Sequence, residues 1–332
     1  MVTVVRTPMR VSLFGGGTDY PAYFRRNGGS VIGFAIDKYI YISSLLLNAH
    51  TDYRFRVSYS TVELVDRADA IRHPVVRALL AHYGWDQPTD FSIQADLPAS
   101  AGLASSSAFT VGMVNVLSHL KGIPRTRMEL AREAIHTEQA LLKENVGVQD
   151  QLHAAFGGFN RFDFSGEDTF RITPVHISGS ALHAMTQGMV LVYTGLKRNA
   201  SEVVAEQLAN TRARKVDAEL GHMLTMVDEA QKVLESGSGE SQLADIAALL
   251  HESWALKRGL SSGISSQRIN ELYDHCLRHG ALGGKLCGAG GGGFLLMVVP
   301  PERRPVFEAA VGVRNCIGFD VDFHGTTVLG RM

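Results

Sequence analysis

The sequence lacks several signatures of common functional classes. Its cysteines, Cys276, Cys287 and Cys316, show no CxxC spacing, so neither a disulfide framework nor a zinc knuckle is indicated. HExxH does not occur among the 13 histidines, and GxxxxGK[ST] does not occur at all, which argues against a zincin motif and a Walker A loop. The longest clean apolar run, residues 294–299, is far too short to span a bilayer.

Charge is balanced as well. The chain has 332 residues, a formal net charge of -1, 45% hydrophobic and 20% charged residues. These values predict a globular protein of about two domains and give no reason to expect nucleic-acid or membrane partners. The N-terminus enters an apparent strand without the apolar segment of a signal peptide, so the expected location is cytoplasmic.

Glycine is the residue that stands out. The chain holds 34 glycines, somewhat above the ordinary ~7%, and the surplus lies largely in three segments at 15–17, 98–107 and 288–293. Bare backbone N–H groups at glycine approach anions closely, and neighbouring serines add hydroxyls. Three such segments predict a phosphate-handling site assembled from distant parts of the chain.

The periodicity predicts a mixed α+β fold without regular strand–helix alternation. Strand-like runs cover 31–47, 54–65, 91–95, 159–177, 189–194, the flanks of the third glycine segment and 319–328. Helices are expected from the triple serine at 105–107, after the capping-box sequence Thr126 to Glu129, from about 199 to 234, and over 241–258 and 267–279.

The middle segment is the best phosphate cradle. A strand ends near Pro98, small residues follow, and serines open a helix whose N-terminal dipole favours phosphate. The alternative is an ordinary serine N-cap. The segment predicted to bind ATP phosphates comprises Pro98, Ser100, Ala101, Gly102, Leu103, Ala104, Ser105, Ser106 and Ser107.

The third segment formally satisfies the dinucleotide motif GxGxxG. That motif requires a following helix and an acidic residue about 20 positions later, whereas here a strand-like run follows and Val313 stands near the acidic position. We therefore expect a strand–glycine–strand hairpin, with Gly288, Gly290 and Gly291 allowing another backbone to approach closely.

Two carboxylates are candidates for chemistry. Glu138 interrupts the apolar stripe of a helix, and with Ser106 it suits Mg²⁺, which takes few protein oxygens; the alternative is a rolled helix that exposes Glu138. Asp150 lies in an expected loop among flexible residues, which suits general-base work on an alcohol. Asp150 alone is equally consistent with a turn aspartate.

Two further polar residues lie around the first glycine segment. Arg10, on an expected strand, can keep the Asp150 carboxylate ionised or stabilise a transferring phosphoryl group. Asp19 can accept hydrogen bonds from substrate hydroxyls; its alternative role is to cap the turn at 18–20.

Taken in order, these segments resemble the three motifs of the kinase superfamily named for galactokinase, homoserine kinase, mevalonate kinase and phosphomevalonate kinase. The resemblance spans essentially the whole chain. Within the superfamily the sequence is similar to bacterial heptose 7-phosphate kinases and related sugar kinases, as carried by residues 15–20, 147–160, 193–195 and 281–294.

The resemblance implies an α+β fold of two lobes. The first, expected over 1–175, resembles ribosomal protein S5 domain 2, and the second, over 176–332, is ferredoxin-like. ATP and Mg²⁺ are the implied cofactors, with ATP between the lobes. The implied reaction is phosphorylation of a sugar hydroxyl, most simply the anomeric one, by a monomer or homodimer, with Asp150 and Arg10 as catalytic residues.

One departure bears on the substrate. Galactokinases carry a glutamate where this chain has Gly16, and losing that carboxylate enlarges the pocket and removes repulsion against an anionic sugar. The expected substrate residues are Gly16, Gly17, Thr18, Asp19, Asp150, Thr194, Lys197 and Arg198. Lys197 and Arg198 suit a sugar phosphate but are equally consistent with exposed charges before a helix. An L-fucose-type or galactose-type kinase and a non-catalytic sugar sensor are the competing interpretations.

Overall fold

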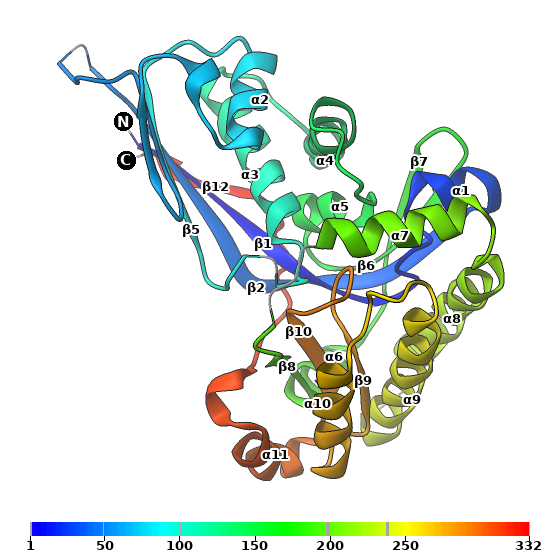
Figure 1. The fold of residues 1–332 in the computed structure, drawn as a ribbon. Helices are drawn as coiled ribbons and strands as arrows, with labels where there is room; N and C mark the ends of the chain where they lie inside the picture. Colours follow the sequence, from blue (N-terminus) through cyan, green and yellow to red (C-terminus); the bar gives the residue numbers. More distant parts are fainter. Residues whose placement is uncertain (1, 49, 100, 197–199, 237–238, 332) are drawn as a thin grey trace.

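The computed structural model describes residues 2–48, 50–99, 101–196, 200–236 and 239–331. Within them the chain forms two sheets, one of eight strands and one of four. Helices cover both sheets, and the N- and C-terminal ends lie together at one edge of the larger sheet (Figure 1). Of the described helices, none combines the length and apolar character needed to cross a bilayer.

The larger sheet is built on two long antiparallel strands, β1 (Val2–Phe14) and β2 (Gly29–Leu46). Its path runs β12-β1-β2-β5-β3-β4, and β6 and β7 extend from β2. Among the described strands of this sheet, only β3 and β5 pair in parallel. The remaining strands are β3 (Phe55–Ser58), β4 (Val62–Val65), β5 (Thr89–Ala95), β6 (Phe159–Ser165), β7 (Thr169–Pro174) and β12 (Thr327–Arg331).

Helix α3 (Ser105–Leu120) packs against β1 and β2, and it is buried along most of its length. The capping box at Thr126 and Glu129 is formed as predicted and starts α4 (Arg127–His136), because the two residues satisfy each other's free backbone N–H groups. A π-helical turn (Thr137–Leu141) follows α4. The other helices of this lobe are α1 (Pro21–Asn27), α2 (Pro74–His82) and α5 (Gln149–Phe156).

The smaller sheet has the order β11-β8-β10-β9 and is antiparallel throughout. Its strands are β8 (Met189–Tyr193), β9 (Gly283–Leu286), β10 (Phe294–Val298) and β11 (Cys316–Ile317). Its helices are α6 (Gly179–Gly188), α7 (Ala200–Arg212), α8 (Asp217–Ser236), α9 (Gly239–Arg258), α10 (Gln267–Arg278) and α11 (Arg304–Val311). Helix α8 also contacts β1 and β2, which joins the two lobes.

The end of the chain returns to the first lobe. Strand β12 pairs with β1, and Val321 forms a bridge with Ile36. The expected lobe division at 175/176 therefore places β12 with the wrong sheet. We propose that the first lobe comprises the residues up to about 175 together with this final strand, and that the second lobe comprises the residues between them.

Other elements differ from the sequence prediction in detail. The helical region expected from 199 to 234 is two helices, α7 and α8, because the backbone turns at Arg214, whose φ is 58°. The strand expected over 319–328 reduces to the Val321 bridge and the start of β12. The short helices α1, α2, α6 and α11 carried too little periodic sequence to be predicted.

The third glycine segment forms the predicted hairpin, because β9 and β10 pair antiparallel across it. It also permits the predicted close approach. A Cβ atom added at Gly288 would lie 2.5 Å from the Cα of Gly102, and one added at Gly102 would lie 2.6 Å from the Cys287 carbonyl oxygen. The hairpin of the second lobe thus packs backbone to backbone against the middle segment of the first.

Candidate active site

A cavity of about 1050 Å³ joins the three glycine-rich segments. Its lining includes most of the site residues expected from the sequence, drawn from both lobes: Arg10, Gly16, Gly17, Asp19, Gly102, Ala104, Ser105, Ser106, Glu138, Asp150, Gly288 and Gly290. The acid at 150 and the serine-lined turn therefore lie on one cavity, as a shared reaction site requires.

The start of α3 is arranged as an anion site. Its N-cap is Ala104, in the left-handed conformation at φ 63°, and no side chain caps the helix. The ordinary serine N-cap considered above is thus not formed, and no side chain of the described residues caps the backbone N–H groups that begin α3. Ser105 and Ser106 line the cavity at this helix end, where the dipole attracts phosphate.

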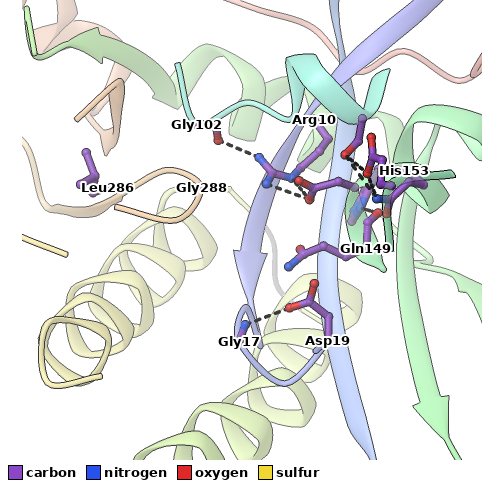
Figure 2. A network of polar contacts seen from close by, with 12 residues as sticks. Arg10, Gly17, Asp19, Gly102, Gln149, His153, Leu286 and Gly288 are labelled. Carbon is purple, nitrogen blue, oxygen red and sulfur yellow. Dashed lines mark hydrogen bonds and ion pairs between the residues drawn. The ribbon is translucent and has the colours of Figure 1, made fainter. Parts of the chain in front are cut away.

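Arg10 and Asp150 form the predicted ion pair. The Asp150 Oδ1 atom lies 3.0 Å from Arg10 Nε and 2.9 Å from a terminal guanidinium nitrogen. Arg10 also donates from Nη1 to the Gly102 carbonyl at 2.8 Å, as Figure 2 shows, and its backbone N–H donates to Leu103 at 3.1 Å. Arg10 is 4% exposed. Its buried guanidinium therefore holds both the Asp150 carboxylate and the middle glycine segment at 98–107.

The structure corrects the expected setting of Asp150. It is not in a loop but is the second residue of α5. The first turn of a helix favours a carboxylate through the positive end of the dipole. The Asp150 side chain remains 29% exposed and lines the cavity, so it is held in place yet open to a ligand.

Glu138 lies in the π-helical turn and is 1% exposed, so the alternative of an exposed glutamate is wrong. Burial raises the pKa of Glu138 to about 7, and side-chain hydrogen bonds from Thr110, Gln151 and Ser107 only partly offset it. Ser107 Oγ donates to Glu138 Oε2 at 2.9 Å, and Gln151 Nε2 donates to the same oxygen. Among the described residues, Oε1 has no hydrogen-bond partner.

This carboxylate fits a divalent cation. A buried carboxylate oxygen without a partner is costly unless a ligand satisfies it, and Glu138 and Ser106 both line the cavity. The hydroxyl that touches Glu138 is that of Ser107, whereas Ser106 is exposed to the cavity. Within the described residues there is no group of three or more His, Cys, Asp or Glu side chains that could hold a metal ion.

Asp19 is 2% exposed, and burial together with the charge of Asp150 raises its pKa. Its Oδ1 atom accepts the Gly17 backbone N–H at 3.0 Å, so the turn-capping role is formed. Asp19 also lines the cavity, and Figure 2 shows it facing the same opening as Gln149. Both roles considered for this residue are therefore compatible with its position.

Gly147 leaves no room beside this carboxylate, because an added Cβ would lie 1.9 Å from Asp19 Oδ2. We expect Gly147→Ala to displace Asp19 and raise KM for the acceptor roughly tenfold or more, since a mispositioned polar contact costs about 1–3 kcal/mol. Steady-state kinetics with each substrate varied in turn measure this. Gly179→Ala is the control, since nothing lies within 4 Å of its Cβ position. Equal KM values in both variants would contradict the contact.

Some expected site residues lie elsewhere. Thr18 and Thr194 do not line the cavity, contrary to the prediction, because backbone carbonyls occupy their hydroxyls: Thr18 donates to Gly15 at 2.8 Å, and Thr194 donates to Gly293 at 2.9 Å. Pro98, Ala101, Leu103, Ser107 and Gly291 do not line the cavity either. Ser100, Lys197 and Arg198 lie outside the described residues.

The polar residues of the lining that were not singled out from the sequence include Ser12, Gln149, Lys257 and Lys285. Ser12 Oγ and Gln149 Oε1 are buried and have no partner among the described residues. A Cβ added at Gly16 would lie 3.7 Å from Ser12 Oγ and 3.8 Å from Gln149 Nε2. The absence of a side chain at 16 therefore leaves these two groups open to the cavity.

One end of the same cavity is apolar and aromatic, and none of the motifs found in the sequence points to it. His73 lies against Phe109, with ring centroids 4.9 Å apart, and edge-on to Tyr59 at 4.9 Å. Ile93 and Leu97 complete this end. Flat aromatic and aliphatic surfaces of this kind are typical of sites for a planar ring.

Sequence profiles place the chain among known proteins. The profile of the GHMP kinases N terminal domain matches residues 69–158, and that of the GHMP kinases C terminal domain matches 231–313. The D-glycero-alpha-D-manno-heptose 7-phosphate kinase of Campylobacter jejuni is 26% identical, over 97% of this chain and 96% of its own length. A galactokinase of Thermotoga maritima is 24% identical over 86% of each chain.

Solved structures agree on the fold. A D-glycero-D-manno-heptose 1-phosphate kinase from Bacteroides thetaiotaomicron superposes with a TM-score of 0.80 at 21% identity, covering 100% of both chains. Lactococcus lactis galactokinase in complex with galactose gives 0.75 at 20% identity, covering 99% of this chain and 95% of its own. With both domain profiles matched in order and the two-lobed architecture in place, the chain belongs to the GHMP kinase family.

Proposed function

We propose that this protein is an ATP-dependent sugar kinase. The observation that carries the proposal is the Arg10–Asp150 pair, which lies on one cavity with the uncapped N-terminus of α3. Phosphoryl transfer asks the protein mainly for alignment and charge stabilisation. Asp150 can align an alcohol. Arg10, which is bound to the middle glycine segment at 98–107, can stabilise the charge.

The nucleotide is assigned to the first-lobe side of the cavity. Backbone N–H groups around Gly102 to Ser106 face the polyphosphate at the start of α3. The aromatic end formed by Tyr59, His73 and Phe109 takes the adenine ring. This arrangement supports ATP binding because it pairs an apolar slot for the base with a dipolar end for the phosphates.

Glu138 and Ser106 are the residues that would hold Mg²⁺. When bound, Mg²⁺ neutralises charge on the β- and γ-phosphates. Ser107 and Gln151 hold the Glu138 carboxylate from the side of Oε2, which leaves Oε1 as the free ligand atom. Ser107 is therefore a positioning residue for Glu138.

In the reaction, Asp150 orients the acceptor hydroxyl and takes its proton as the hydroxyl oxygen bonds to the terminal phosphorus of ATP. The bond from that phosphorus to the bridging oxygen breaks, and ADP leaves. Arg10 holds the Asp150 carboxylate in place before transfer and offsets charge on the moving phosphoryl group. Because Arg10 also contacts the Gly102 carbonyl, alignment of acceptor and donor depends on one side chain.

The acceptor we propose is a heptose 7-phosphate, phosphorylated at its anomeric hydroxyl. The similarity to the Campylobacter heptose 7-phosphate kinase supports this choice, as does the missing carboxylate at Gly16, which removes repulsion against an anion. Ser12, Gln149 and Asp19 present hydrogen-bonding groups to sugar hydroxyls in the space that Gly16 leaves.

A panel of acceptors in an ADP-release assay with MgATP tests the proposal. The panel contains D-glycero-D-manno-heptose 7-phosphate, the corresponding heptose 1-phosphate, the unphosphorylated heptose, galactose and L-fucose. We expect the highest kcat/KM with the heptose 7-phosphate. The similarity to galactokinases favours galactose as the second candidate, and the panel separates the two. Tight binding of a sugar without ADP release would indicate a non-catalytic sensor and contradict a kinase.

A further inference from the structure

Two lysines of the second lobe enter the cavity. Lys257 comes from the end of α9 and Lys285 from β9, and they are 7% and 2% exposed. Both line the same cavity as Arg10 and Asp150. The mechanism proposed above does not use either of them.

Neither lysine is paired with a carboxylate among the described residues. Lys285 Nζ donates to the Leu13 carbonyl at 2.7 Å. Lys257 Nζ donates to the Leu286 carbonyl at 3.3 Å and to that of Gly288. In Figure 2, Leu286 and Gly288 lie on the other side of Arg10 from Gln149 and His153. A carbonyl partly solvates an ammonium group but does not neutralise it, so each buried positive charge lacks a counter-ion.

The surrounding charges compensate the two lysines only in part. Asp150 is already paired with Arg10, and the pKa of Asp19 is raised. Burial lowers the pKa of Lys285 to about 7, with the charge of Lys257 adding to the effect, and burial lowers that of Lys257 to about 8. The other titratable or charged groups that act on the two lysines are Arg10, Asp19, Asp150 and Cys287.

A pair of lysines that only held the hairpin in place would be destabilising, because two like charges are buried together and neither is paired with a carboxylate of the described residues. A bound dianion reverses this balance, because it supplies the counter-charge that the described residues do not. Such pairs of cationic donors lining one cavity are suited to phosphoryl oxygens.

We propose that Lys257 and Lys285 together bind a phosphoryl group, as an anion site that the second lobe contributes to the cavity. The assignment to a phosphoryl group rests on the proposed kinase function, and two sources share this chemistry. One is the phosphate ester carried by the acceptor sugar, and the other is the terminal phosphoryl group of ATP.

Sulfate is the first probe, because it is a tetrahedral dianion that does not titrate near neutral pH and needs no turnover. Isothermal titration calorimetry of the intact protein at pH 8, in two buffers of different ionisation enthalpy, reports affinity and proton uptake. We expect wild-type protein to take up protons on binding, since the dianion raises the pKa of both lysines, and at pH 8 Lys285 is mostly neutral and Lys257 about half protonated. Lys257→Met and Lys285→Met should each weaken binding about tenfold and reduce the uptake.

Two sets of variants serve as controls. Lys121→Met removes a lysine that also donates to a backbone carbonyl, that of Tyr83, but does not line the cavity, and it should bind sulfate as wild type does. Lys257→Arg and Lys285→Arg keep a charge that does not titrate, so they should retain binding but lose proton uptake. If the methionine variants do not fold, the loss of proton uptake in the arginine variants still tests the proposal. Unchanged affinity and uptake in the folded double methionine variant would overturn the proposal.

Two further titrations separate the sources. One uses a non-hydrolysable ATP analogue with Mg²⁺, and the other compares heptose 7-phosphate with the unphosphorylated heptose. Weakening of the analogue assigns the site to the transferring phosphoryl group, and weakening confined to heptose 7-phosphate assigns it to the acceptor. If both ligands bind normally while only sulfate is lost, the site takes an adventitious ion only and the proposal is wrong. A protein that turns over no sugar in the panel would still give all the sulfate results.

Discussion

Asp150→Asn is expected to lower kcat at least about 10³-fold while leaving the affinity for the ATP analogue within about twofold. General-base and alignment roles of a catalytic carboxylate contribute about 10²–10⁴ in rate, and asparagine cannot take a proton. It can still accept a hydrogen bond from Arg10, which at present lies 2.9 Å from the carboxylate. The phosphate segment tied to Arg10 through the Gly102 carbonyl should therefore keep its position. Single-turnover kinetics and equilibrium titration of the analogue measure the two quantities.

Asp163→Asn is the matched control. Asp163 is also an aspartate paired with an arginine, at 2.7 Å from Arg161 Nε, but it does not line the cavity. Its variant should keep wild-type turnover. Turnover of Asp150→Asn within tenfold of wild type would remove Asp150 from the reaction, and loss of analogue binding would show that the pair with Arg10 mainly supports the fold.

The Arg10–Asp150 contact could be predicted although 140 residues separate its partners, because each residue lies in a motif with its own chemical logic. The same holds for the glycine hairpin. Its strand-like flanks predicted a turn, and its glycines predicted a close backbone approach, which the structure places at Gly102. Motif order thus carried information about contacts that periodicity alone does not contain.

The setting of Asp150 could not be predicted in the same way. Helix α5 has only eight residues and lies between glycines at 147 and 157, so turn-forming residues conceal its short helical pattern. The prediction for the serines at the start of α3 was limited in a similar way. The sequence pairs Ser106 with Glu138, but which of the three consecutive serines turns toward Glu138 depends on the rotation of α3. The structure turns Ser107 inward and leaves Ser106 on the cavity.

Lys257 and Lys285 show what sequence patterns omit. Lys257 ends an ordinary amphipathic helix, and Lys285 lies two residues before a buried cysteine in a short strand. Nothing in the spacing distinguishes either from a solvated lysine. Ser12 and Gln149 could not be predicted either. They are open to the cavity because residue 16 is a glycine, and the missing side chain is noticed only when the sequence is compared with that of a galactokinase.

Glu138→Gln is the second change with a large expected effect. It should lower kcat/KM about 10²-fold or more at fixed Mg²⁺, since a neutral amide replaces a buried carboxylate that contacts Ser107 in the first turn of α3. Metal ligands contribute several kcal/mol to such transition states. Titrating activity against Mg²⁺ should show a requirement shifted to higher concentrations. Ser106→Ala should shift it less, because a hydroxyl is a weaker ligand.

The pH dependence has a definite sign. Burial raises the pKa of Glu138 from 4.5 to about 7, so without metal the folded protein holds a proton there that the unfolded chain releases above about 4.5. The free energy of unfolding should therefore fall as pH rises from about 4.5 to 7. Mg²⁺ binds the ionised form, so its affinity should fall as pH drops through 7. In Glu138→Gln both dependences should largely disappear.

Thermal unfolding across pH 5–8, with and without Mg²⁺, measures these effects. Glu133→Gln is the control, because Glu133 is a partly buried glutamate paired with Arg125 at 2.9 Å and lies outside the cavity lining. Without metal, Glu138→Gln should be more stable than wild type at pH 8, since it removes an uncompensated buried charge. Added Mg²⁺ should reduce this difference in stability, because it stabilises only the wild type. A variant that is less stable than wild type under metal-free conditions would show that the carboxylate is compensated within the fold, and Glu138 would then have no need of a cation.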